Sequence, residues 1–226
     1  MVISAVVPTL NEEKSVAATL ERLRAAGPET EIVLADGGSS DRTVEKARPW
    51  CNRVLVTERG RARQMNAGAA ASRGEILLFV HADTLVPLGY VAEIAAALAD
   101  ARVVGGRFDV SLDDGRLAFQ LIGRLISLRS RLTRTATGDQ AIFVRRDLFE
   151  RLGGFPEIEL CEDLEFARRL KRLGKIACLR NTVTTSARRW QREGLARTVL
   201  RMWAIRLLYL SGAPPRLLRR FYSDCR

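Results

Sequence analysis

One stretch of the sequence carries a strand, a turn and a helix start in immediate succession: Glu31-Ile32-Val33-Leu34-Ala35-Asp36-Gly37-Gly38-Ser39-Ser40-Asp41-Arg42-Thr43. Its apolar first part has the length and composition of a buried strand. The two glycines let a ligand approach the backbone, and Ser40 or Asp41 can cap the helix that follows. Asp36, at the end of the strand, can accept hydrogen bonds from a base or a ribose. Spacing alone, however, favours an ordinary tight turn before a capped helix.

The same alternation of strand and helix continues on both sides of that stretch. Strands are predicted at residues 2–7, 31–35, 53–56, 76–80, 103–110 and 141–144. Helices are predicted from Val16 to the Gly27-Pro28 stop and over residues 41–48, 62–72, 116–131 and 162–173, the last capped by Gly174. Apolar strands separated by amphipathic helices are typical of a largely parallel open sheet with helices on both faces. The predicted fold class is therefore α/β.

The basic residues are concentrated at the C-terminal end of the chain. The 226 residues include 37 Lys and Arg against 26 Asp and Glu, a formal net charge of +11. Residues 188–226 contain ten arginines against Glu193 and Asp224, or +8, which leaves +3 for the other 187 residues. A basic tail predicts an anionic partner, namely substrate phosphates, an acidic membrane surface or nucleic acid. A solvated, arginine-rich surface explains the excess equally well.

The cysteines and the hydropathy pattern indicate the compartment. Cys51, Cys161, Cys178 and Cys225 are scattered, without CxxC or zinc-type spacing. We expect them to be buried thiols in a reducing compartment. No basic segment precedes the first apolar run, and no stretch of about 18 uncharged apolar residues occurs. The sequence therefore predicts a cytoplasmic protein without a signal peptide or a spanning helix.

Polar residues directly follow three of the predicted strands. They are Thr9-Leu10-Asn11-Glu12, Asp36-Gly37-Gly38-Ser39 and His81-Ala82-Asp83. In open α/β sheets the ligand site lies where the C-terminal ends of strands meet the following helices. Asp83 could hold a divalent cation through its carboxylate oxygens, although a strand-end Asp often caps the next turn. His81 is the only histidine, which excludes histidine-based zinc clusters, and a lone histidine there is more often structural than catalytic.

A pair of acidic residues, Glu162-Asp163, opens the helix predicted over residues 162–173. Acidic side chains in a first turn interact favourably with the helix dipole, and that alone accounts for the pair. The functional alternative is a general base that faces a substrate pocket. Adjacent carboxylates cannot both face the same pocket, and the sequence leaves open which of the two does.

Taken in order, these motifs resemble the family 2 glycosyltransferases, which use a nucleotide-sugar-binding fold of the GT-A type. The resemblance is carried by Pro8–Glu13, Asp36–Asp41, Asp83 and Glu162-Asp163, and further by Gly60–Gly68, Thr137–Arg146, Gly153–Pro156 and Ser186–Trp190. It covers about residues 1–212. In detail the sequence is similar to a small bacterial subgroup associated with radical-SAM or selenodomain proteins and with arsenosugar biosynthesis.

The resemblance implies a role for each matching residue. Pro8, Thr9 and Glu12 would line the nucleoside pocket, Asp36 would read the base, and Arg61 and Gln64 would contact the base or the diphosphate. Arg189-Trp190 would close over the site. The full set expected to bind the nucleotide sugar is Pro8, Thr9, Glu12, Asp36, Arg61, Gln64, His81, Asp83, Gly138, Asp139, Arg189 and Trp190.

The resemblance also implies a metal and a base. Asp83 would carry Mg²⁺ or Mn²⁺ bound to the diphosphate of the donor. Asp163 would be the catalytic base, with Glu162 as the alternative. His81 stands where most of the family has an acidic residue, which leaves one carboxylate fewer beside the metal.

The implied reaction moves a sugar from a nucleoside-diphosphate donor to an acceptor that the sequence does not identify. A hydroxyl attacks the anomeric carbon, the cation and arginines stabilise the leaving diphosphate, and the base takes the proton, so one displacement inverts the configuration. A nucleotidyltransferase would need a glycine-rich phosphate loop at the N-terminus, which Pro8-Thr9-Leu10-Asn11 is not. The alternative from another class is a non-catalytic nucleotide- or nucleic-acid-binding protein. Because no aromatic platform or recognition helix accompanies the basic tail, we expect no nucleic-acid partner.

The chain is predicted to form a GT-A domain over residues 1–190, with a nucleotide-binding half at 1–100 and an acceptor half at 101–190. Residues 191–226 would form a basic amphipathic helical segment, with one helix from Leu195 to Leu210. Most of that helix is apolar, so the domain, a second subunit or lipid must cover it. Packing on the domain is the simplest expectation. The alternatives are a homodimer contact or peripheral association with the inner face of the membrane.

Overall fold

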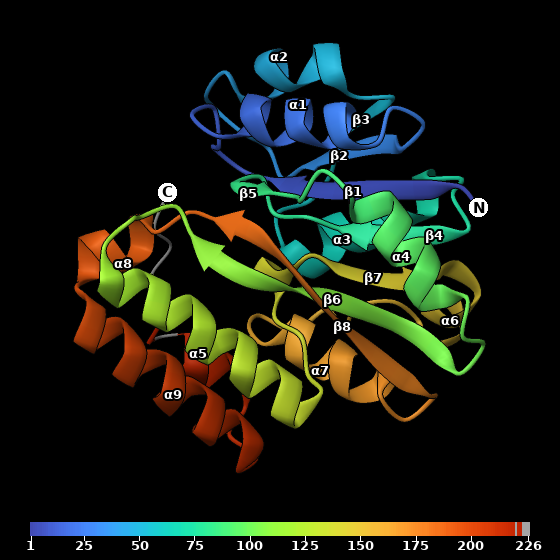
Figure 1. Ribbon diagram of the computed structural model, residues 1–226. Coiled ribbons are helices and arrows are strands. Elements are labelled where there is room, and N and C mark those ends of the chain that lie inside the picture. The colour runs from blue at the N-terminus through green and yellow to red at the C-terminus, as the bar shows by residue number, and fades with distance from the viewer. Residues whose placement is uncertain (220, 223–226) are drawn as a thin grey trace.

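Figure 1 shows a computed structural model of the chain, which describes residues 1–219 and 221–222. Cys225 and the tail residues Arg220, Asp224 and Arg226 lie outside the described part. The strands are β1 (Ile3–Thr9), β2 (Glu31–Asp36), β3 (Arg53–Val56), β4 (Ile76–Phe79), β5 (Thr84–Leu85), β6 (Val103–Leu112), β7 (Ile142–Arg145) and β8 (Lys175–Thr185). The helices are α1 (Val16–Ala26), α2 (Thr43–Ala47), α3 (Arg61–Ala71), α4 (Tyr90–Leu98), α5 (Leu117–Thr133), α6 (Arg146–Arg151), α7 (Glu162–Leu170), α8 (Arg188–Glu193), α9 (Leu195–Leu210) and α10 (Pro215–Arg219).

The strands form one sheet, in the order β3-β2-β1-β4-β7-β6-β8-β5. β3, β2, β1 and β4 are parallel, and β6 and β8 are parallel to each other. β7 is antiparallel to both of its neighbours, and β5 is antiparallel to β8. Within the described residues, four of the seven adjacent pairs are therefore parallel, which confirms the predicted α/β fold with a mostly parallel open sheet.

The strand order reverses at the centre of the sheet. From β1 the chain moves outward to β2 and β3, and it then returns to place β4 on the other side of β1. Such a reversal leaves a crevice at the carboxyl ends of the two central strands, where ligands bind in open α/β sheets. Thr9 ends β1, while His81 and Asp83 follow β4 directly. The topology therefore brings polar residues from two predicted motifs to one crevice.

Helices cover both faces of the sheet, as predicted. Every residue of β1 is buried, and its side chains alternate between the two faces. Val7 belongs to the apolar cluster that contains Leu20 of α1 and Ile94 of α4. Val6 belongs to the opposite cluster, which contains Met65 of α3. The sheet is also continuous across residue 100, because β4 pairs with β7.

Strand β8 is the longest element that the sequence pattern does not predict. Its exposed centre, around Arg180 and Asn181, interrupts the alternation of apolar residues. The strand is stabilised instead by pairing with β6 along nearly its whole length, with a register shift after Phe108. Helix α7 also differs from its prediction, because it ends at Leu170.

Helices α9 and α10 lie within the C-terminal segment predicted over residues 191–226, and α9 has the predicted bounds, whereas α8 begins before that segment, at Arg188. Figure 1 shows α9 alongside α5 below the sheet. Ile205 of α9 packs with Leu160 and with Leu218 of α10, and the hydroxyl of Tyr209 donates to Glu165 over 2.9 Å. One side of α9 is therefore packed on the domain. In the part of the chain that the structure describes, no helix is both long and apolar enough to cross a bilayer.

Candidate active site

A cavity of about 670 Å³ lies at the carboxyl ends of β1 and β4 and extends between α5 and α9. Its volume is in the range of pockets that hold small molecules. The walls contain most of the residues that the sequence singles out, namely Pro8, Thr9, Glu12, Arg61, Gln64, His81, Asp83, Gly138, Asp139, Asp163, Arg189 and Trp190. Two of the predicted residues, Asp36 and Glu162, are not part of the wall.

The adjacent carboxylates Glu162 and Asp163 have different surroundings. Asp163 lines the cavity, and its oxygens accept hydrogen bonds from the backbone N–H groups of Gly138 and Leu164, each over 2.6 Å. Glu162 is only 2% exposed, and its Oε1 lies 2.9 Å from Nε of Arg61. Burial raises the pKa of Glu162, and the charge of Arg61 opposes that shift. Of the two, Asp163 is therefore the carboxylate that can meet a substrate.

Gly138 brings the backbone against His81. A Cβ atom at position 138 would lie 2.5 Å from Nε2 of His81, so a residue with a side chain does not fit without a shift. Loss of water around the ring and the charge of Arg61 lower the pKa of His81 to about 4, against the opposing effect of Asp139 and Asp163. The imidazole is therefore neutral at pH 7 and can act as a hydrogen-bond donor or acceptor.

Arg188 connects two of the predicted nucleotide-binding residues, and the sequence analysis assigns it no role. Its guanidinium lies 2.5 Å from Oε1 of Glu12 and 3.1 Å from Oδ2 of Asp83. Burial raises the pKa of Asp83, and Arg188 opposes that shift. The sequence feature that points to Arg188 is the motif Ser186–Trp190, in which Arg188 directly precedes the Arg189-Trp190 pair.

Asp36 lies behind the cavity wall. Its carboxylate accepts hydrogen bonds from the hydroxyl of Thr9 over 3.1 Å and from the backbone N–H groups of Gly38 and Ser39 over 2.9 and 2.7 Å. Gln64 of α3 connects the ends of β1 and β2, because its side-chain amide donates hydrogen bonds to the carbonyls of Thr9 and Ala35. In this arrangement Asp36 holds the turn after β2, and recognition of a base by Asp36 stays a prediction.

The fit of a divalent cation depends on Asp83. No three His, Cys, Asp or Glu side chains gather into a metal site within the described residues. Asp83 supplies one carboxylate on the cavity wall, in place beside Arg188. Mg²⁺ is commonly held by one or two carboxylates together with phosphate oxygens and water. The donor set therefore fits a cation that arrives with a diphosphate, and it does not form a closed protein cage.

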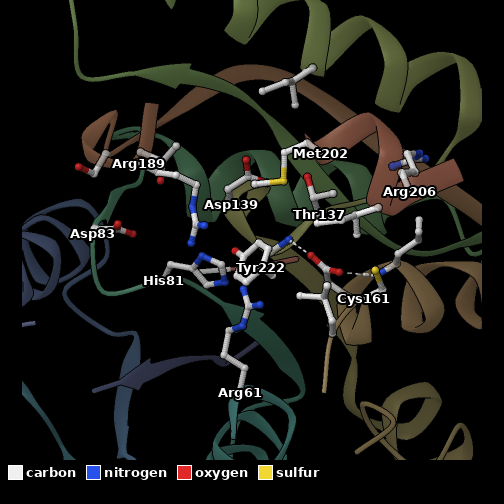
Figure 2. A pocket seen from close by; sticks show the side chains of 18 of the residues that line it. Arg61, His81, Asp83, Thr137, Asp139, Cys161, Arg189, Met202, Arg206 and Tyr222 are labelled. Carbon is white, nitrogen blue, oxygen red and sulfur yellow. Dashed lines mark hydrogen bonds between the residues drawn. The ribbon is translucent and has the colours of Figure 1, made fainter. Parts of the chain in front are cut away.

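Several further residues of the cavity carry no sequence motif. Figure 2 shows Tyr222 among the cavity side chains near Arg61 and His81, and its ring lies 4.3 Å from the guanidinium carbon of Arg189. Arg206 of α9 lies at the far end of the same view. Both residues belong to the C-terminal segment, far along the chain from the strand ends. Only the packing of α9 and α10 on the domain brings them to the cavity.

Known proteins share this fold. S. aureus TarS 1–349 in complex with UDP-GlcNAc is 25% identical and has a TM-score of 0.66 over 82% of this chain and 58% of that one. Mannosyltransferase PcManGT from Pyrobaculum calidifontis, in complex with GDP-Man and Mn²⁺, is 22% identical, with a TM-score of 0.67 over 90% of this chain and 60% of that one. Both likenesses agree with the GT-A type of fold.

Sequence comparison gives the family. A PGL/p-HBAD biosynthesis glycosyltransferase of Mycobacterium tuberculosis is 30% identical in an alignment 164 residues long, which covers 67% of this chain. The match spans 62% of the length of that relative. Residues 4–153 match the model of glycosyl transferase family 2. The chain therefore belongs to glycosyl transferase family 2.

Proposed function

We propose that this chain transfers a sugar from a nucleoside-diphosphate sugar to an acceptor, with inversion at the anomeric carbon. The observation that carries the proposal is a single cavity that holds the Asp163 carboxylate together with Arg61, Arg188 and Arg189. Family membership supports the transfer of a sugar. The nucleotide sugars in the two solved relatives support a nucleoside-diphosphate donor.

The donor lies at the carboxyl ends of β1 and β4. Pro8 and Thr9 line the nucleoside end, and Asp36 and Gln64 hold the turn behind them. Arginines on the cavity wall stabilise the negative charge that grows on the leaving diphosphate. Residues 1–100 supply the nucleoside end of the donor site, whereas Arg188, Arg189 and Asp163 come from residues 101–190.

Asp163 acts as the base. Backbone hydrogen bonds from Gly138 and Leu164 fix its orientation, and each carboxylate oxygen keeps a second lone pair. The acceptor oxygen bonds to the anomeric carbon while the bond from that carbon to the diphosphate oxygen breaks. The proton passes to Asp163, and the diphosphate leaves with the electron pair. One displacement inverts the configuration and needs no second carboxylate as a nucleophile.

A divalent cation, Mg²⁺ or Mn²⁺, would be held by Asp83 and by the diphosphate. When bound, it supplies positive charge to the leaving group. Arg188 forms an ion pair with the same carboxylate, so Asp83 would interact with both the arginine and the cation. We therefore expect the donor to bind without a metal ion, and to bind with higher affinity when a metal ion is present.

Calorimetry tests the donor site. The full chain is titrated with UDP and with GDP, with and without Mn²⁺. We expect one of the two to bind with higher affinity when Mn²⁺ is present, and Asp83→Asn to remove that increase. Asp147→Asn, at an exposed position outside the cavity, is the matched control and should behave as the wild type. Failure of both nucleotides to bind, with or without metal, would contradict the proposed donor site.

The outer side of the C-terminal segment supports peripheral contact with an acidic membrane. Leu200 and Leu207 are exposed on α9, and Arg197 is exposed on the same helix. Apolar residues beside arginines suit a membrane interface, and each arginine near an anionic surface contributes about 1 kcal/mol. We expect sedimentation with acidic vesicles at low salt and its loss at high salt. A concentration-dependent dimer without vesicle binding would assign this side to a second copy of the chain.

A further inference from the structure

The cavity has an apolar end that a nucleotide donor does not use. Beyond Asp163 it continues between α5 and α9, where Leu125, Leu128 and Leu132 line one wall and Val199, Met202 and Trp203 line the other. In Figure 2, Arg206 lies at the opposite end of the view from Asp83, and Met202 lies between them. We call this apolar end the α5/α9 channel. It is continuous with the position of the base.

The packing of α5 explains why these leucines face the channel. On its inner side α5 has small residues, and a Cβ atom at Gly123 would lie 2.8 Å from the carbonyl oxygen of Val110 in β6. The hydroxyl oxygen of Ser127, on the same side, accepts a hydrogen bond from the backbone N–H of Val110 over 3.0 Å. Because the helix lies flat on β6 through this side, the leucines three and four residues apart point away from the sheet. Leu125 and Leu128 are half-exposed and Leu132 is mostly exposed, so this end of the cavity is open to the outside.

Two arginines stand where the channel meets Asp163. Arg129 of α5 and Arg206 of α9 both line the cavity. Burial lowers the pKa of both, and Arg129 further lowers that of Arg206 because the two charges are close. The buried Nε of Arg129 has no hydrogen-bond partner among the described residues. Arg206 donates to the hydroxyl of Thr135 over 3.0 Å. The charge of Asp163 opposes the lowering of the pKa in both arginines, and that of Asp139 opposes it in Arg129. Within the described residues neither arginine forms an ion pair with a carboxylate, so the two partly desolvated cations favour an anionic group between them.

From this arrangement we infer that the acceptor is an amphipathic molecule, with an apolar body in the α5/α9 channel and an anionic group between Arg129 and Arg206. Its accepting oxygen then lies at Asp163, on the side of the cavity opposite the diphosphate. The inference rests on the proposed function, because it assigns the acceptor of the same site. It also explains the exposed leucines on α5, because an exposed apolar patch without a ligand lowers the solubility of a protein.

Alkyl phosphates are suitable probes, because they combine the two features. The full chain is titrated calorimetrically with octyl phosphate below its micellar concentration, and in parallel with hexyl phosphate, inorganic phosphate and neutral octyl glucoside. We expect one octyl phosphate per chain. Hexyl phosphate has two methylenes fewer and should bind about fifteenfold more weakly, from a loss of about fourfold in affinity per buried methylene. Inorganic phosphate and octyl glucoside should each bind more weakly than octyl phosphate.

Matched variants separate the channel from the general surface. Leu125→Ser should weaken octyl phosphate binding about tenfold. Leu121→Ser is its control, because Leu121 is 57% exposed against 54% for Leu125 and does not line the cavity. Arg129→Gln and Arg206→Gln should each weaken octyl phosphate about tenfold and leave octyl glucoside unchanged. Arg124→Gln, at an exposed position on α5 outside the cavity, is the control for charge.

Different results would contradict the acceptor assignment and the proposed sugar transfer. Equal losses in Leu125→Ser and Leu121→Ser, or binding that is indifferent to both arginines, would overturn the acceptor assignment and leave a nonspecific or membrane-docking surface. If UDP or GDP binds as expected while octyl phosphate does not, the acceptor class alone is wrong. If neither nucleotide binds but octyl phosphate does, the proposed transfer fails, and with it the identification of the channel ligand as an acceptor.

Discussion

Gly138 lies between His81 and the proposed base Asp163, and its position leaves no room for a side chain. Gly138→Ala would bring a methyl group to 2.5 Å from His81 and 3.5 Å from Asp163. We expect the fold to persist and sugar transfer to fall about tenfold or more, because small displacements of a catalytic group are costly. Gly115→Ala, where a Cβ atom meets nothing within 4 Å, is the control. Thermal unfolding and turnover, measured on both variants, check this expectation.

Glu162 and Asp163 should respond differently to removal of their charges. Glu162→Gln leaves Arg61 without its buried partner, and we expect a loss of about 1–3 kcal/mol in the free energy of unfolding, reduced because Arg61 is one third exposed. Asp163→Asn should cost less, about 1 kcal/mol, because the amide nitrogen of asparagine cannot accept one of the two backbone hydrogen bonds that reach Asp163. Glu150→Gln, which removes an exposed carboxylate 3.7 Å from Arg146, should change stability by less than about 0.5 kcal/mol. Urea unfolding measures all three, and a stable Glu162→Gln would show that its ion pair with Arg61 contributes little.

The thiols of Cys51 and Cys161 should resist alkylation. Burial raises the pKa of each to about 12. An unfolded thiol has a pKa of about 8.5, so at pH 8.5 about half of it is thiolate, whereas the folded thiols stay protonated. The protonated form is favoured in the folded state, and its contribution to stability is present below about pH 8.5 and is lost as the pH rises toward 12. Mass spectrometry after iodoacetamide treatment should show slow labelling of both peptides until urea unfolds the chain.

At the scale of elements, the contact of α5 with β6 sets the width of the α5/α9 channel. Helix propensity alone predicts that Gly123→Ala stabilises the chain by about 1 kcal/mol. The added methyl group would instead meet the carbonyl of Val110 at 2.8 Å, and overpacking of this kind costs about 1–3 kcal/mol. We therefore expect lower stability, measured by urea unfolding. A more stable variant would show that α5 can move away from β6 freely.

The elements that the sequence predicts well are those whose own residues carry the periodicity. The observed bounds of β2, β3 and α9 match the predicted ones or differ by one residue. Their apolar runs are local, and polar residues, glycine or proline mark where they end. β8 is different: its central residues are polar, and pairing with β6 supplies the stabilisation. The antiparallel insertion of β7 between β4 and β6 has no local signal either. Long-range pairing of this kind cannot be predicted from the periodicity of one segment.

The site shows the same division between local and long-range information. Motifs at strand ends identify Thr9 and Asp83, because strand order places them at one crevice. Local motifs could not distinguish Asp163 from Glu162, because the two residues are adjacent in the first turn of α7. Only the orientation of that turn decides that Asp163 faces the cavity and that Glu162 is buried against Arg61. Arg206 carries no motif, and only the packing of the C-terminal helices brings it to the cavity.

At the scale of the whole molecule, one continuous sheet brings Thr9 and Asp83 from its N-terminal part, and Asp163 from the C-terminal part of the chain, to one cavity. The central claim is that this cavity cleaves a nucleotide sugar with Asp163 as the base. The most direct measurement is release of nucleoside diphosphate from a panel of UDP- and GDP-sugars with Mn²⁺, with water as the slow acceptor, by the wild type and by Asp163→Asn. We predict that one donor is cleaved by the wild type, and that Asp163→Asn binds this donor equally well but releases at least about a hundredfold less diphosphate. Cleavage by Asp163→Asn at the wild-type rate, or no binding and no cleavage of any donor by the wild type, would contradict the account.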